Sequence, residues 1–436
     1  MATFCTDFTD ITHFAPQKIG PMSARFVAHG GVATPRGFQA TGVAAGFRPN
    51  DPNRLDVALV ISDRPAFCSG VFTQNIFSAA PVEVCKEHIA DGRAQAFFMN
   101  SGCANAATGA QGLEDAHAMA HIAADALGLQ KKDVLIASTG VIGQHLNMNA
   151  VKKGAFEGAK NLQGEHDGGH SAACAIMTTD THPKECAISW KTADKRFSKA
   201  TFTIGGMAKG SGMIMPNMAT MIAALTTDAP LSHEASDALL KSIVSKTFNK
   251  VTVDGDTSTN DTCIFMANGA AAPKLVGIIE PGDVAYNEIQ EVLYTVASTL
   301  ARSMAADGEG ATKLVTVHVS GANSDKDADN IARTVANSPL VKTAIYGHDA
   351  NWGRIAGAIG RSGVSLAPCD IDITFMGVPV LRAGLPVPFN EDEMLELFKQ
   401  NEIIISINLG TGLHETTMWT CDLTTDYIHI NADYRS

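Results

Sequence analysis

Short apolar runs alternate along the chain with longer stretches in which apolar residues recur every three or four positions. The short runs are rich in valine, isoleucine and phenylalanine and predict strands, whereas the longer stretches predict helices. The predicted strands are Leu55–Ser62, Ala96–Asn100, Val134–Ser138, Thr201–Ile204, Leu314–Ser320, Ile371–Phe375, Ile403–Leu409 and Tyr427–Asn431. The predicted helices are Leu113–Leu127, His233–Phe248 with Ser232 as its N-cap, Asn287–Ala306, Asp327–Ala336 and Glu391–Gln400.

This alternation predicts the α/β class, with helices layered on sheets. The length of 436 residues allows about two to four domains or one large two-lobed unit. The first 25 or so residues lack periodicity, so we expect them to form a loosely attached arm.

The amino-acid composition argues against several classes of protein. Lys and Arg total 33 against 45 Asp and Glu, a formal charge of −12, which argues against nucleic-acid binding. No run approaches the roughly 18 apolar residues of a membrane helix, and the N-terminus carries acids where a signal peptide carries Lys or Arg. Nine cysteines without a C-x-x-C pair are typical of reduced thiols. We therefore expect a soluble cytoplasmic protein.

Two familiar site patterns fail when their spacing is checked. Lys209 precedes Gly210, whereas a phosphate-binding loop requires Gly-Lys-Ser/Thr in that order. His117 and His121 stand one helical turn apart, but Ala118 occupies the place of a zincin glutamate and no third ligand lies nearby in the sequence. We expect no nucleotide site and no metal.

The segment Lys209–Asp228 is the most informative in the chain. It runs from a glycine-rich loop through the turn signal Pro216-Asn217 into a short apolar strand that begins at Thr220. The segment alone leaves two interpretations open: Thr220 is either an ordinary strand-start threonine or a nucleophile at the mouth of a strand.

This segment resembles the self-cleavage region of the ornithine acetyltransferase family, the arginine-biosynthesis enzymes also called bifunctional glutamate N-acetyltransferases. Further blocks match family signatures in the family's order from about residue 29 to the end. These blocks are Ser138–Gly143, Met177–Thr181, Val253–Asp261, Gly308–Lys313, Asn351–Ile355 and Tyr427–Ser436. The joint match is far more specific than any block alone.

The resemblance implies a layered α/β sandwich of the ornithine acetyltransferase/D-aminopeptidase type. It also implies that the chain cuts itself between Ala219 and Thr220 into an α chain, 1–219, and a β chain, 220–436, that share one core. A threonine hydroxyl is a weak nucleophile and needs a base. The freed α-amine of Thr220, with an ordinary pKa of about 7.7–8.0, would supply that base beside the hydroxyl.

The carried-over cycle moves the acetyl group of N-acetylornithine through Thr220 to glutamate in a ping-pong mechanism. Thr139 and Gly140 match the family's oxyanion hole. Thr181, Lys209, Glu309, Asn431 and Ser436 match its substrate-binding positions, with Lys209 suited to a carboxylate. Glu309 would hold the cationic side chain or relay a proton. The resemblance implies no metal and no organic cofactor, acetyl-CoA as a further acetyl donor, and an α–β heterodimer that assembles into a heterotetramer or larger.

Three departures from the family pattern bear on donor and acceptor choice: Cys103, His348 with Ala350, and the stretch Thr411–Glu415. We expect Cys103 to be a buried thiol and not a nucleophile. Two rival functions stay open. One is an N-terminal-nucleophile amidohydrolase or peptidase, or an acyltransferase of a specialised pathway acting on another amine. The other is an uncleaved binding or assembly protein without activity.

Overall fold

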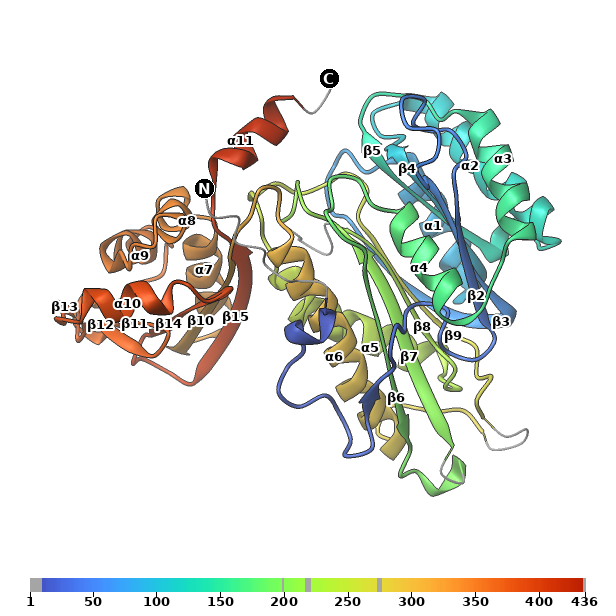
Figure 1. Ribbon diagram of the computed structural model, residues 1–436. Coiled ribbons are helices and arrows are strands. Elements are labelled where there is room, and N and C mark those ends of the chain that lie inside the picture. The colour runs from blue at the N-terminus through green and yellow to red at the C-terminus, as the bar shows by residue number, and fades with distance from the viewer. Residues whose placement is uncertain (1–9, 198–199, 216–220, 273–276, 434–436) are drawn as a thin grey trace.

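The computed structural model describes residues 10–197, 200–215, 221–272 and 277–433, which form a large and a small lobe (Figure 1). The large lobe is built on a nine-stranded sheet in the order β1-β6-β7-β8-β9-β3-β4-β5, with β2 paired to β3. Its strands are β1 Arg25–Phe26, β2 Phe38–Val43, β3 Val57–Phe72, β4 Arg93–Cys103, β5 Val134–Val141, β6 Lys184–Lys191, β7 Thr201–Lys209, β8 Ile222–Thr227 and β9 Thr262–Ala267.

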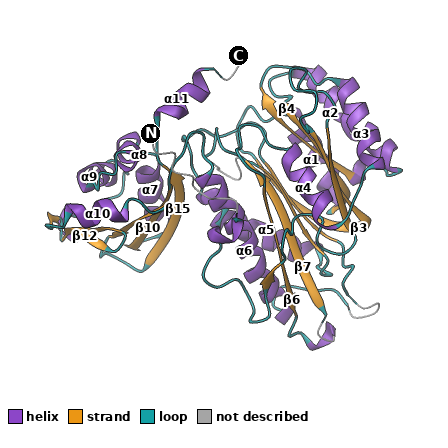
Figure 2. Cartoon of the chain, viewed as in Figure 1, coloured by secondary structure: helices purple, strands orange, loops and turns teal. Residues whose placement is uncertain are grey.

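Helices cover both faces of this sheet (Figure 2). They are α1 Ala80–His88, α2 Gly109–Leu127, α3 Met148–Lys160, α4 Glu165–Ala175, α5 His233–Lys246 and α6 Val284–Ala306. Successive side chains of a strand point to opposite faces. Ala223 and Leu225 of β8 accordingly join the apolar core under α5 and α6, whereas Ile222 and Ala224 join the core under α1 to α4. The large lobe is therefore a three-layer sandwich.

The small lobe has a six-stranded sheet in the order β13-β12-β11-β14-β10-β15. Its elements are β10 Leu314–Ala322, α7 Asp325–Ala336, α8 Pro339–Tyr346, α9 Trp352–Gly360, β11 Asp372–Phe375, β12 Val378–Arg382, β13 Leu385–Pro386, α10 Glu391–Leu397, β14 Glu402–Asn408 and β15 His414–Cys421. Alternate residues such as Val315, Val317 and Val319 bury one face of the sheet. Helix α11 Thr425–Ala432 follows β15 and extends away from this lobe (Figure 1).

Strands from the two halves of the sequence interleave in the large sheet. Strands β8 and β9 follow position 220, yet they lie between β7 and β3, which precede it. Residues 204–209 of β7 pair antiparallel with residues 222–227 of β8. The loop that joins these two neighbouring strands contains Ala219 and Thr220, which lie outside the described residues.

The predicted α/β layering is confirmed, and so are all five predicted helices. Ser232 caps α5, because its hydroxyl accepts a hydrogen bond from the Ala235 N–H at 3.0 Å. None of the described helices is long and apolar enough to cross a membrane.

The strand predicted over Tyr427–Asn431 is wrong, because these residues lie in α11. The Thr424 side chain accepts from the Tyr427 N–H, and Asp426 lies in the first turn, where a helix favours negative charge. This N-terminal signal outweighs the β-branched alternation of the segment, since Ile428 remains exposed and no sheet face is buried.

The expected loose N-terminal arm is also wrong from residue 11 onward. A 3₁₀ turn, Ile11–Phe14, buries Phe14 against α6, and the Arg302 guanidinium donates to the Phe14 carbonyl at 2.8 Å. Strand β1 then pairs with β6. Residues 1–9 lie outside the described residues.

Candidate active site

A cavity of 270 Å³ lies in the large lobe beside the ends of β5, β7 and β8. It is lined by Thr139, Gly140, Val141, Ile142, Thr178, Thr179, Lys209, Gly212, Met213, Ile214, Met221, Ile222, Ser258, Thr259, Asn260, Asp261, Glu309 and Asn431. Five residues that the sequence predicted for the site therefore meet at one cavity. They come from β5, β7, the turn after α6, and α11.

Thr139 and Gly140 stand near the end of β5. Gly140 has a φ of 131°, and a Cβ there would clash with the backbone of Gly102 on neighbouring β4. Only glycine fits that position without strain. The Asn260 side-chain amide donates to the Ser138 carbonyl at 2.8 Å and to the Ala104 carbonyl at 2.6 Å. Asn260 thus holds the backbone beside Thr139 and Gly140, which line the cavity.

Asn260 was not predicted as a site residue. Asn260 belongs to the polar block Val253–Asp261, which matches a family signature. The match alone assigns no role to the individual residues of the block. Asp254 of that block accepts hydrogen bonds from the Met213 N–H at 2.7 Å and the Ile214 N–H at 2.9 Å. The block therefore positions two parts of the chain beside the cavity: Asn260 holds the end of β5, and Asp254 holds the glycine-rich loop.

Lys209 ends β7 and reaches the cavity while only 8% exposed. Burial lowers the pKa of its ammonium, while the nearby carboxylates of Asp180 and Glu309 oppose that change. The cavity consequently contains a cation whose charge depends on neighbouring acids.

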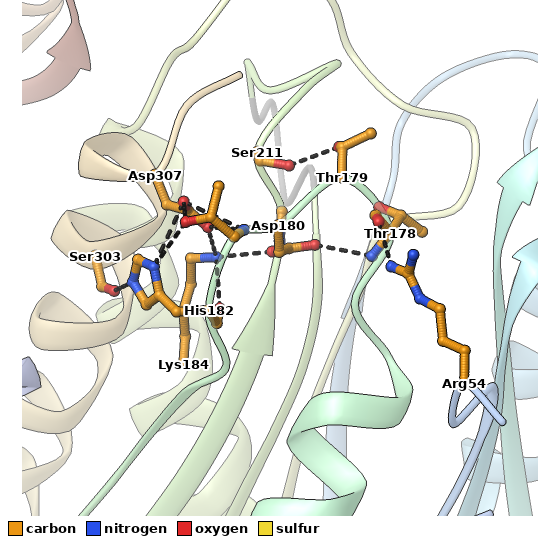
Figure 3. A network of polar contacts seen from close by, with 11 residues as sticks. Arg54, Thr178, Thr179, Asp180, His182, Lys184, Ser211, Ser303 and Asp307 are labelled. Carbon is orange, nitrogen blue, oxygen red and sulfur yellow. Dashed lines mark hydrogen bonds and ion pairs between the residues drawn. The ribbon is translucent and has the colours of Figure 1, made fainter. Parts of the chain in front are cut away.

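A buried polar network connects Asp180, Lys184 and Asp307 (Figure 3), and the charges of Asp180 and Lys184 act on Lys209. The Lys184 ammonium, 0% exposed, donates to Asp180 at 2.7 Å and to Asp307 at 2.6 Å. The Gly210 N–H also donates to Asp180, at 2.7 Å. Burial by itself would raise the pKa of Asp180, but Lys184 and Lys209 hold it well below its usual value. The network fixes the chain at the point where β7 enters the glycine-rich loop.

Thr181 belongs to this network and is not among the residues that line the cavity. Its N–H donates to Asp307 at 3.0 Å, and its hydroxyl also contacts that carboxylate. Two neighbouring threonines line the cavity instead, and the Thr179 hydroxyl bonds the Ser211 hydroxyl at 2.7 Å.

Glu309 follows α6 through a tight turn and is 7% exposed. Its N–H donates to the Ser211 carbonyl at 2.9 Å, and its carboxylate accepts from the Asn431 side-chain amide at 2.7 Å. A Cβ on Gly212 would overlap this carboxylate. Asn431 of α11 therefore reaches the cavity through a hydrogen bond to the Glu309 carboxylate.

The predicted cleavage residues Ala219 and Thr220 lie outside the described residues, as does Ser436. Ile214 and Met221, which stand on either side of the undescribed segment 216–220, both line the cavity.

None of the departures from the family pattern lines the cavity. Cys103 is buried, as predicted, and burial raises the pKa of its thiol, so that it is protonated at neutral pH. His348 lies in the small lobe. The Thr411 hydroxyl donates to the Gly321 carbonyl at 3.0 Å, and Glu415 faces His318 at 3.9 Å.

Comparison with known proteins gives concordant matches. A model of the ArgJ family matches residues 39–436. The chain is 45% identical over 408 residues to the "Arginine biosynthesis bifunctional protein ArgJ" of Symbiobacterium thermophilum, covering 93% of this chain and 99% of that protein. The protein of the same name from Bacillus anthracis is 43% identical over 413 residues, covering 94% and 98%. A crystal structure of the Bacillus halodurans protein aligns at 42% identity over 48% of this chain and 97% of that chain, with a TM-score of 0.46.

Proposed function

The chain belongs to the ArgJ family of bifunctional arginine-biosynthesis acetyltransferases, and on that premise we propose that it moves the acetyl group of N-acetylornithine to glutamate through Thr220. One observation supports this most: a single cavity is lined by Thr139, Gly140, Lys209, Glu309 and Asn431. Ile214 and Met221, the lining residues nearest to Thr220 in sequence on either side, line the same cavity.

Maturation would begin with attack of the Thr220 hydroxyl on the Ala219 carbonyl. The peptide N–C bond breaks as the ester bond forms, and the proton moves from the hydroxyl to the amine. Water then hydrolyses the ester, which leaves a carboxylate on Ala219 and a free α-amine on Thr220. The products would be the α chain 1–219 and the β chain 220–436.

In the acetyl cycle, the Thr220 amine accepts the hydroxyl proton as the oxygen attacks the acetyl carbonyl. The Thr139 hydroxyl and the Gly140 N–H donate to the resulting oxyanion. Ornithine leaves with the proton, and the amine of glutamate then attacks the acetyl ester. Glutamate thereby becomes N-acetylglutamate, and Thr220 is regenerated.

Charge complementarity suggests how the substrate lies. Lys209 would pair with the α-carboxylate and Glu309 with the side-chain ammonium of acetylornithine. Asn431 would orient the Glu309 carboxylate that it already contacts. Thr181 and Ser436 complete the set that we propose for substrate binding, Thr181 through Asp307.

Acetyl-CoA as a second acetyl donor is consistent with the bifunctional name of the relatives. The cavity of 270 Å³ is near the lower limit of ligand pockets, so acetyl-CoA would insert its acetyl end and leave the nucleotide outside. We further propose a cytoplasmic α–β heterodimer that forms a heterotetramer or larger. The eight described cysteines are free, which is consistent with a reducing compartment.

N-terminal sequencing and intact mass test the proposal together. The purified protein should yield the sequence Thr-Met-Ile-Ala, and Thr220→Ala should leave one species of 45.8 kDa without turnover. Thr220→Ser, which keeps a hydroxyl, should still cleave. Fragmentation of the alanine variant would refute the proposed origin of the cut.

Substrate assays separate the remaining alternatives. Acetylornithine with glutamate should give acetylglutamate much faster than free acetate. Faster release of acetate would support the amidohydrolase alternative, and a single uncut, inactive chain would support the binding-protein alternative.

A further inference from the structure

Three potential metal ligands meet on the large lobe, away from the active-site cavity. Glu87 and His88 end α1, and His117 lies on the adjacent helix α2 (Figure 1). Each residue offers one ligand atom, and these atoms all lie within 4.8 Å of one another. None of the three lines the active-site cavity.

His88 is oriented as a metal ligand would be. It is 5% exposed, and its Nδ1 lies 2.8 Å from the Val134 carbonyl at the start of β5. A ring nitrogen that faces a carbonyl carries the proton, which leaves the Nε2 lone pair available.

His117 has an unsatisfied buried atom. Its Nδ1 is buried without a hydrogen-bond partner, and its Nε2 lies 3.5 Å from Glu87 Oε2. A buried polar atom without a partner costs free energy. The nitrogen that faces Glu87 is Nε2, so this imidazole and this carboxylate face one another as two ligands of one ion would.

We propose that Glu87, His88 and His117 form a binding site for a divalent transition-metal ion such as Zn²⁺. Two imidazoles and one carboxylate are a common zinc donor set. Around a tetrahedral zinc with bonds of about 2.1 Å, ligand atoms stand about 3.4 Å apart. Glu87 Oε2 and His117 Nε2, which lie 3.5 Å apart, already have this spacing, and all three ligand atoms lie within 4.8 Å of one another.

The fourth coordination position would hold water. It would face a shallow groove lined by Ala90, Asp91, Gln130, Lys131 and Lys132 as well as by Glu87 and His88. The ion would clamp α1 to α2 above β5, the strand that carries Thr139 and Gly140, and so would stabilise this part of the large lobe.

The sequence alone does not predict a metal site at His117 and His121, because no third ligand stands nearby. Both histidines lie on α2, but their neighbours differ. His121 faces Asp125 on its own helix at 3.7 Å, whereas the partners of His117 come from α1, 29 and 30 positions earlier. His121 is therefore a matched control.

The test is a titration of chelator-stripped full-length protein with Zn²⁺ against a chromophoric chelator. We expect one equivalent to bind with a micromolar or lower Kd and to raise Tm by a few degrees. His117→Ala and Glu87→Gln should each weaken binding at least about 10-fold, whereas His121→Ala should leave it unchanged. Co²⁺ in place of Zn²⁺ should give the visible absorption of a four-coordinate site.

Several results would overturn the site: no binding below about 100 μM, full binding by the double variant E87Q/H117A, or equal loss in His121→Ala. The readouts are metal affinity, Tm and absorption, so they do not depend on the proposed acetyl transfer.

Discussion

The charge of Lys209, which we propose as a substrate-binding residue, depends on its burial and on its neighbours. Its ammonium is buried, which lowers its pKa, and Asp180 acts in the opposite direction. A carboxylate substrate requires the charged form. Binding should therefore be complete at pH values below the lowered pKa and be lost as the pH rises through it.

We accordingly expect KM for acetylornithine to rise with pH at values below 10.5, the ordinary pKa of lysine. Asp180→Asn should move this rise to lower pH, because it removes the acid that favours the charged ammonium. Lys209→Arg should move it to higher pH, since a guanidinium stays protonated. Initial-rate measurements across pH check this, and superimposable profiles for all three proteins would contradict it.

Asn260 acts on the proposed oxyanion hole without contacting the oxyanion. Asn260→Ala removes both donors to the Ser138 and Ala104 carbonyls, which costs about 1–3 kcal/mol of stability. Displacement of Thr139 and Gly140 should also lower kcat about 100-fold.

Asn268→Ala is the control for this variant. Asn268 is buried to a similar extent, and its amide donates to the Arg36 carbonyl and the Ser62 hydroxyl, away from the cavity. Denaturation should show comparable losses for both variants, with kcat lowered only in Asn260→Ala. An equal fall in kcat would mean that stability alone explains the effect.

At the scale of elements, helix α11 contributes to the site but not to the core. None of its residues is buried, and Asn431 reaches Glu309. A chain ending at Thr424 should therefore melt within about 2 °C of the full chain. Its kcat/KM should fall about 10- to 100-fold, because a hydrogen bond to a charged group contributes about 1.5–3 kcal/mol.

Asn431→Ala should reproduce most of that loss, whereas Ile428→Ser, on an exposed position of the same helix, should not. Calorimetry and initial rates together check the prediction. A large drop in Tm without a kinetic effect would assign α11 to stability instead.

The prediction of helices and strands from the sequence succeeded where the hydrophobic pattern had one physical cause. The five helices and most strands follow from apolar periodicity over a buried face. It failed at Tyr427–Asn431, where alternation was present but no sheet was available, and the cap at Thr424 decided the structure. The sequence analysis also missed Lys184. Its partner Asp307 lies 123 positions later in the chain, and no pattern in the sequence indicates that the two side chains meet.

At the scale of the whole molecule, Lys184 joins segments that the proposed cut would place in different chains. Asp180 and Lys184 precede position 219, and Asp307 follows it. The lowered pKa of Asp180 means that its contribution to stability is present at neutral pH and is lost as the pH falls below about 4, the ordinary pKa.

Lys184→Met should cost about 3–5 kcal/mol, because two buried carboxylates lose their common cation. The triple variant that also carries Asp180→Asn and Asp307→Asn should recover part of this loss, since the uncompensated charges are gone. Chemical denaturation at pH 7 measures both, and a triple variant less stable than Lys184→Met would contradict the charge explanation.

Because β8 and β9 lie between β7 and β3, the proposed cut at Ala219–Thr220 would fall between two paired strands of one sheet. The two polypeptides would therefore stay associated through this sheet after the cut. Once severed, the two polypeptides would no longer be tethered, and recovery from full denaturation would require a second-order encounter. An uncut chain would renature at a rate independent of its concentration, whereas the mature enzyme would do so more slowly with every dilution.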